Sequence, residues 1–126
     1  MLVENLPETD LAVLQEIRHL KLTTRASPRI DVFEACQAIT LHNLGAGING
    51  LDLLIQTLPQ VIDRNLKVNQ PHDTFLSWDE RWLVSLVRSV CANDFDSVQF
   101  LIRVLIPKMY QSEIKTITSE LLRLSA

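Results

Sequence analysis

Residues 41–62 have the sequence LHNLGAGINGLDLLIQTLPQVI, in which apolar side chains recur at alternating intervals of three and four positions. This apolar seam consists of Leu41, Leu44, Ile48, Leu51, Ile55, Leu58 and Ile62. Residues at that spacing fall on one face of an α-helix. Three successive heptads are also the pattern by which the helices of a coiled coil pair. The stretch therefore predicts a long helix with one continuous apolar face.

This helix is expected to begin at Ser27-Pro28, because serine is a good helix cap and proline fits the first helical turn. Gly45, Gly47 and Gly50 interrupt it, and each costs about 1 kcal/mol relative to alanine in a helix interior. Further on, Pro59 removes one backbone hydrogen bond. Because the seam continues past the glycines and the proline, we expect one bent helix rather than two separate helices.

Helical periodicity extends over most of the remaining chain, and strict alternation of apolar and polar residues is rare. We expect further helices over residues 10–22, from 77 to about 91, between Asp96 and Pro107, and over 112–124. The predicted fold is all-α: a bundle of about five helices with one long, kinked second helix, forming a single domain over residues 1–126.

The start of the third predicted helix has the clearest local signal. Ser77 and Glu80 have the spacing of a capping box, in which each side chain accepts a hydrogen bond from the other residue's backbone amide. The buried face of this helix is predicted to consist of Trp82, Leu83, Leu86, Val87 and Val90. Trp78 lies in the first turn, and we expect it either to cap the helix or to be exposed as a contact.

Composition excludes several classes of protein. The 126 residues are 47% apolar and 21% charged, which is typical of a globular domain rather than a disordered chain. The net charge of -3 argues against a nucleic-acid partner. No signal peptide is apparent, and no apolar run approaches the roughly 20 residues that span a bilayer, so no membrane association is expected. Two cysteines are too few for a disulfide framework, which favours a cytoplasmic location.

The sequence Gly45-Ala46-Gly47-Ile48-Asn49-Gly50 matches the G-x-G-x-x-G pattern of dinucleotide-binding turns. That turn requires a buried strand before it and a crossover helix after it. The residues before Gly45 have helical periodicity instead, so no nucleotide cofactor is expected. The alternative explanation is structural: small residues allow another helix to approach closely.

The sequence His42-Asn43-Leu44 precedes the same small residues. This stretch resembles the phosphoacceptor helix of two-component signalling, found in the dimerisation helix of histidine kinases and in histidine-phosphotransfer proteins. In the kinase family an acidic or amide residue follows the acceptor histidine, as Asn43 does here. The family's core positions correspond to Leu44, Ile48, Leu51, Ile55 and Leu58. The resemblance implies a phosphotransfer protein with His42 as its phosphoacceptor.

Metal and enzyme chemistry find little support. His19, His42 and His72 are far apart in the sequence, and none forms the i, i+4 pair that places two metal ligands on one helix face. We therefore expect no metal site. Nor does the sequence group an acid, a base and a nucleophile, so no catalytic residues are expected.

The leading interpretation is a non-catalytic, cytoplasmic helical interaction or regulatory protein whose partner is a protein. It is expected to form a homodimer through the second helix, because that helix has more apolar seam than a small bundle needs. The predicted interface residues are Leu44, Ile48, Leu51, Ile55 and Leu58. Phosphotransfer through His42 is the alternative.

We predict that a phosphorylated receiver domain, or a small phosphoramidate donor, leaves no acid-labile, base-stable phosphate on the protein. The phosphotransfer resemblance calls for a basic residue three positions after the histidine, and Gly45 stands there, so phosphorylated His42 would lack a nearby positive charge. Radiolabel incorporation checks this. Label that His42→Ala abolishes without loss of helical content would establish the alternative.

Overall fold

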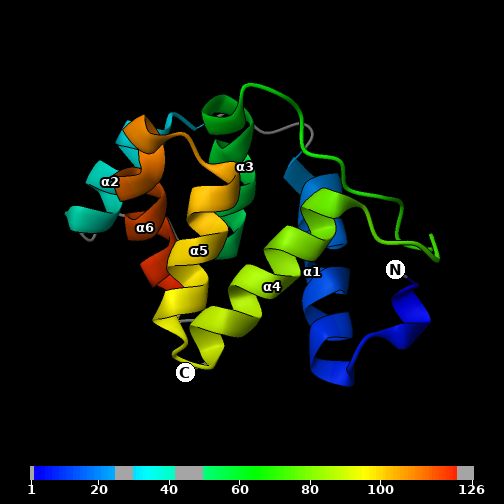
Figure 1. The fold of residues 1–126 in the computed structure, drawn as a ribbon. Coiled ribbons are helices and arrows are strands. Elements are labelled where there is room, and N and C mark those ends of the chain that lie inside the picture. The colour runs from blue at the N-terminus through cyan, green and yellow to red at the C-terminus, as the bar shows by residue number, and fades with distance from the viewer. Residues whose placement is uncertain (1, 25–29, 42–49, 122–126) are drawn as a thin grey trace.

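The structure is a computed structural model that describes residues 2–24, 30–41 and 50–121. Within these ranges the chain is all-α, with no β-strand (Figure 1). The α-helices are α1 (Glu8–Thr24), α2 (Val32–Thr40), α3 (Gly50–Ile62), α4 (Trp78–Cys91), α5 (Phe95–Leu105) and α6 (Gln111–Ser119). Short 3-10 helices, η1 (Val3–Asn5) and η2 (Lys108–Tyr110), precede α1 and α6. No helix in the described ranges is both long and apolar enough to cross a bilayer.

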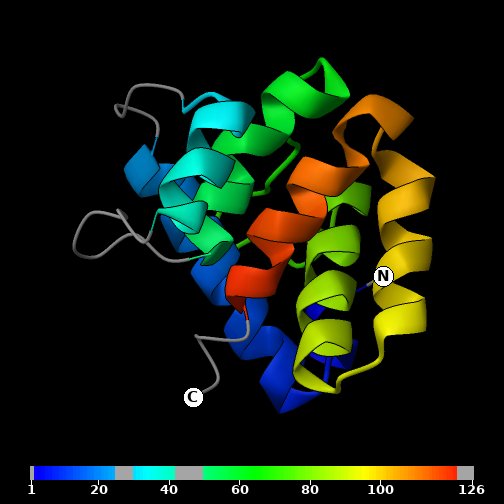
Figure 2. The same ribbon diagram turned by 90° about the vertical axis from the view of Figure 1, so that its left-hand side faces the viewer.

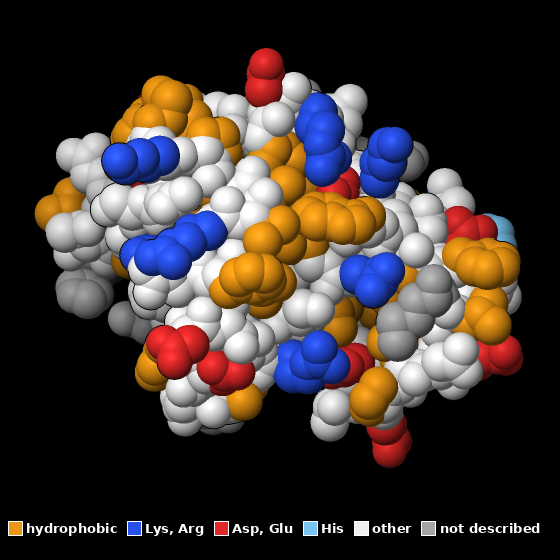
Figure 3. Space-filling model, in the orientation of Figure 1, with side chains coloured by type: hydrophobic (Ala, Val, Ile, Leu, Met, Phe, Trp, Pro, Cys, Tyr) orange, Lys and Arg blue, Asp and Glu red, His pale blue; other side chains and the backbone are white. Residues whose placement is uncertain are grey.

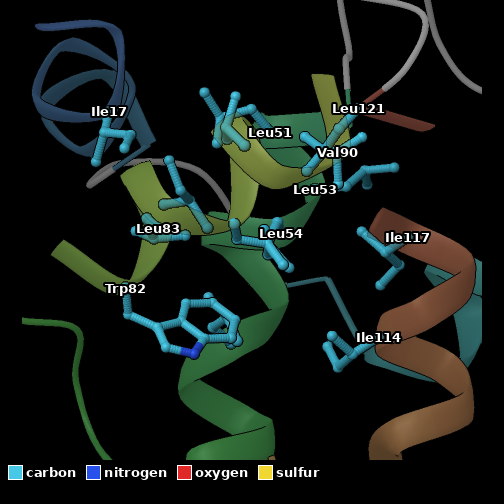
Figure 4. Close-up of a cluster of buried hydrophobic side chains, with 14 of the residues drawn as sticks. Ile17, Leu51, Leu53, Leu54, Trp82, Leu83, Val90, Ile114, Ile117 and Leu121 are labelled. Atoms are coloured by element: carbon cyan, nitrogen blue, oxygen red, sulfur yellow. The ribbon is translucent and has the colours of Figure 1, made fainter. Parts of the chain in front are cut away.

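The helices pack around α3, which contacts α1, α2 and α6 (Figures 1 and 2). Eight of the thirteen residues of α3 are buried, as expected for a helix that is apolar on nearly all sides. Figure 4 shows Leu51, Leu53 and Leu54 of α3 among side chains from α1, α4 and α6. The long helix α1 also contacts α4, and α5 lies beside both α4 and α6. The chain's own helices therefore cover the apolar face of α3, while Asp52, Gln56 and Gln60 lie along its less buried side.

The described residues do not form one long second helix. Helix α2 ends at Thr40, with Leu41 as its C-cap, and α3 begins at Gly50. The backbone N–H of Val32 donates to Gln60 Oε1 over 2.9 Å, and Gln60 Nε2 donates to Asp31 Oδ1 over 2.9 Å. In one continuous helix, residues 31 and 60 would be roughly 44 Å apart at 1.5 Å per residue. The bundle with a single long, kinked helix is thus not confirmed, because α2 folds back and packs on α3.

Side-chain caps explain where three helices begin. Asp31 accepts hydrogen bonds from the amides of Phe33 and Glu34 at the start of α2. The capping box predicted for Ser77 and Glu80 is confirmed at the start of α4. Asp94 caps α5 by accepting from the amide of Ser97. These caps satisfy amides that would otherwise lack a partner in the first helical turn.

The predicted buried face of α4 is also confirmed, since Trp82, Leu83, Leu86, Val87 and Val90 are all buried. Helix α5 ends two residues before Pro107, as a proline that breaks a helix requires. Pro59, by contrast, lies inside α3, which continues to Ile62. The start predicted at Ser27-Pro28 lies outside the described residues.

Gly50 lies where α3 meets the end of α6. A Cβ atom at this position would lie 2.7 Å from the carbonyl carbon of Glu120 and 2.9 Å from the backbone nitrogen of Leu121. Such distances are shorter than van der Waals contact, and these two atoms belong to the backbone, which cannot move aside as a flexible side chain could. The last glycine of the G-x-G-x-x-G sequence therefore permits close helix packing, in agreement with the structural explanation. Gly45 and Gly47 lie outside the described residues.

Replacing Gly50 with alanine is expected to lower the free energy of unfolding by about 1–3 kcal/mol, the usual cost of overpacking a core. A decrease in the free energy of unfolding would be informative, because alanine is the better helix former and would stabilise the protein if the position had room for it. Chemical denaturation measures the change, and Gly50→Val, with a larger side chain, should cost more than Gly50→Ala. An alanine variant as stable as the parent protein would show that the contact with α6 is not tight.

Candidate functional site

A buried ion pair joins α1 to the first turn of α4. Arg18 Nε donates to Glu80 Oε2 over 2.7 Å, and both side chains are almost fully buried. The Arg18 guanidinium also donates to the carbonyl oxygens of Asp73 (2.9 Å) and Phe75 (3.0 Å). Glu80 accepts further hydrogen bonds from the amides of Asn69 and Ser77. The pair therefore fixes the irregular segment 65–77 against α1 and α4.

The neighbouring residue of α4 forms a second ion pair. Arg64 donates to both carboxylate oxygens of Asp79, over 2.7 and 2.8 Å, and the amide of Lys67 donates to Asp79 Oδ2 over 2.8 Å. The hydrogen bond from Arg64 holds the pKa of Asp79 below its usual value, although burial opposes this. The same hydrogen bond raises the pKa of Arg64. Both partners are therefore charged at neutral pH.

A groove lies between α4 and α5. We call it the α4–α5 groove, and it is lined by Trp78, Arg81, Trp82 and Ser85 of α4 and by Phe100, Leu101 and Val104 of α5. Its volume is about 300 Å³. In Figure 3 hydrophobic side chains gather near the middle of this face of the molecule, with Lys and Arg side chains around them.

The floor and the walls of the α4–α5 groove differ in exposure. Trp82 is buried, and its indole Nε1–H donates to the carbonyl oxygen of Leu101 over 2.8 Å, which ties α4 to α5. Trp78, Phe100 and Val104 are 52%, 64% and 52% exposed. Three large apolar side chains thus face solvent around a hollow whose floor is fixed by a hydrogen bond. Of the two roles predicted for Trp78, the exposed contact fits its position.

The predicted interface residues of the second helix lie elsewhere. Leu51, Ile55 and Leu58 are at most 3% exposed and belong to the core of the single chain. They face the chain's own helices, so they are not available as a surface for a second copy. His42, Leu44 and Ile48 lie outside the described residues.

Sequence reasoning missed the α5 side of the groove. Phe100 and Val104 are four residues apart and share one face of α5, away from the buried Val98 and Ile102. Apolar residues on the side of this helix opposite Val98 and Ile102 were the signal available in the sequence. These residues indicate a binding surface only together with Trp78, which lines the same hollow from α4.

The thiols and the described histidines form no reactive cluster. Cys36 and Cys91 are free thiols. Burial raises the pKa of Cys36, and the charge of Glu113 raises it further, which disfavours the nucleophilic thiolate. In the described part of the chain, no three His, Cys, Asp or Glu side chains are grouped so that they could hold a metal ion. His19 and His72 are exposed.

Comparison of the chain with protein-family models, curated proteins and solved structures finds no match. The functional interpretation therefore depends on the α4–α5 groove and on the charged side chains around it.

Asp79→Asn is expected to destabilise the protein at pH 7 by about 1.5–3 kcal/mol, the usual worth of hydrogen bonds to a charged group. Because folding lowers the pKa of Asp79, its stabilising effect is present above the pKa of the unfolded chain, near 4. The effect is lost as the pH falls through the lower pKa of the folded state. Denaturation of both proteins from pH 7 to pH 3 should show the difference shrinking at the acid end.

The matched control for this measurement is Asp96→Asn, since Asp96 is an exposed aspartate in the first turn of α5. It should change stability little at either pH. A difference between the parent protein and Asp79→Asn that stays constant down to pH 3 would contradict the assignment of Asp79 to a charged pair.

Proposed function

We propose that the chain is a non-catalytic, cytoplasmic helical protein that acts by binding another protein through the α4–α5 groove. The observation that carries this proposal is the exposure of Trp78, Phe100 and Val104 around one hollow. Large apolar side chains scattered singly over a surface need no explanation, but a group of them around a hollow is typical of an interaction site.

The energetics of burial favour a protein partner. Covering apolar surface yields about 25 cal/mol per Å², and aromatic side chains supply much of the area and most of the anchors in protein interfaces. The hollow itself, at about 300 Å³, is at the small end of the range for small-molecule sites. A partner that covers the exposed rims as well as the hollow would bury far more apolar surface than a small ligand would.

The other groups in the described structure support a binding role. Four buried charged residues, Asp10, Arg18, Asp79 and Glu80, take part in ion pairs that hold helices or the segment 65–77 in place. These charged groups therefore stabilise the fold. The two free thiols accord with a reducing compartment such as the cytoplasm.

Self-association through the second helix is no longer the favoured form of this proposal. Leu51, Ile55 and Leu58 fill the core of the single chain, and a second copy could reach them only if the bundle opened. The groove offers a surface that is exposed without any such rearrangement. Phosphotransfer stays a separate alternative, and labelling of His42 tests it.

Photo-crosslinking tests the proposed role. A photoreactive phenylalanine analogue at position 100 is expected to form a defined cross-linked species in the cells that make the protein. The protein recovered in that species should then bind the purified chain, and Phe100→Ala should weaken its affinity at least tenfold, because the anchor side chain is lost.

Phe95 provides the matched control. It is a phenylalanine on the same helix with nearly equal exposure, 60% against 64%, and it does not line the α4–α5 groove. The analogue at position 95 should not give the same species, and Phe95→Ala should leave the affinity within about twofold. Equal effects at positions 95 and 100 would contradict the proposal.

A further inference from the structure

The α4–α5 groove is continued by two further hollows along α4, with volumes of about 300 and 190 Å³. One shares Trp78 with the groove and is also lined by Arg64 and Lys67. The other shares Arg81 with the groove and is also lined by Arg88. Cationic side chains from the end of α3 to the last turn of α4 therefore line hollows that adjoin the groove.

The carboxylates of these hollows lie beneath the cations. The acidic residues that line them are Asp79, which is paired with Arg64, and Asp10, which is paired with Arg88 over 2.8 Å. The side chains of Asp79 and Asp10 are 3% and 4% exposed, whereas those of Arg64 and Arg88 are 42% and 59% exposed. Solvent therefore meets mainly the positive partner of each pair.

Two further cations add to the positive charge around the groove. Arg81 and Lys67 are exposed, and neither forms a salt bridge with any residue in the described ranges. The α4–α5 groove itself is lined by no acidic residue. A chain whose net charge is -3 thus has its exposed apolar groove in a locally positive surface.

We infer that the occupant of the α4–α5 groove is an amphipathic helix of a partner protein, with acidic residues beside its apolar face. This inference rests on the proposed function and names the chemistry of the partner. A helix that lies in a groove inserts apolar side chains spaced three, four and seven positions apart. Asp or Glu residues beside those anchors would meet Arg81 and Lys67, and complementary charge of this kind speeds association and selects the partner.

A nucleic acid fits the same surface less well. Its phosphates would meet the cations, but the middle of the groove presents Phe100, Leu101 and Val104, which offer hydrogen bonds to neither phosphates nor base edges. The net negative charge of the chain also opposes the approach of a long polyanion. An acidic helix carries its charge at the edges of an apolar stripe, as the groove does.

Selection from a phage-displayed library of random 16-residue peptides, with the purified full chain as the target, tests this inference. The selected peptides are expected to combine aromatic or leucine residues at helical spacing with Asp or Glu. In fluorescence anisotropy, Arg81→Glu should weaken the affinity of a selected peptide at least tenfold, and added salt should weaken it as well. Arg81→Ala should weaken it less than Arg81→Glu.

Lys115→Glu is the matched control, since Lys115 is an exposed cation on α6 that does not line the groove, and it should leave the affinity within about twofold. Circular dichroism of each variant verifies that the helical content is unchanged. If peptides bind in a manner that depends on Phe100 but lack acidic residues and tolerate Arg81→Glu, this inference is overturned while the proposed function stands.

The remaining outcomes are also decisive. If no selected peptide depends on Phe100, the proposed function fails together with this inference. Binding of a double-stranded DNA oligonucleotide that Arg81→Glu abolishes would assign the surface to nucleic acid. A dimer in sedimentation that Phe100→Ala dissociates would assign it to a second copy of the chain.

Discussion

The buried ion pair between Arg18 and Glu80 is the contact on which the rest of this structure depends. Burying two charges is costly, and the cost is offset only when further hydrogen bonds satisfy both groups. Here the irregular segment 65–77 supplies them, through the carbonyls of Asp73 and Phe75 and the amides of Asn69 and Ser77. The segment has no helix or strand of its own, so its backbone groups gain partners from the same pair. The same hydrogen bonds therefore satisfy both the buried charges and the backbone of the segment. The pair also fixes where α4 begins, because Glu80 lies in the first turn of that helix.

The first turn of α4 contains both buried carboxylates and the exposed Trp78. Ser77 and Glu80 cap the helix, and Asp79 binds Arg64 and the backbone of Lys67. Because the carboxylates of this turn are used inside the protein, the outer surface nearby keeps mainly the positive charges. Trp78, between them in sequence, is left exposed at the end of the groove. The positive rim and the exposed indole are thus consequences of how the fold satisfies its own buried groups.

Local signals in the sequence predicted much of this fold. The capping box at Ser77, the buried face that includes Trp82 and the end of α5 before Pro107 all follow from residues close together in the chain. The reversal between α2 and α3 does not, because it depends on hydrogen bonds between Asp31, Val32 and Gln60, nearly thirty residues apart. Heptad spacing identifies an apolar helix face but does not say what covers it. In this chain the covering surface of Leu51, Ile55 and Leu58 is the protein's own core rather than a second copy.

The groove could not be predicted for a related reason: it is made of residues whose positions relative to each other are set by long-range contacts. The decisive contact is the hydrogen bond from the indole of Trp82 to the carbonyl of Leu101, which holds α4 and α5 together directly below the exposed side chains. A binding surface on two fixed helices loses little conformational freedom when a partner arrives, so more of the burial energy contributes to affinity. The same tryptophan therefore belongs to the core and fixes the floor of the groove, and in the proposed role the exposed apolar residues would bind a partner without further ordering of the helices that carry them.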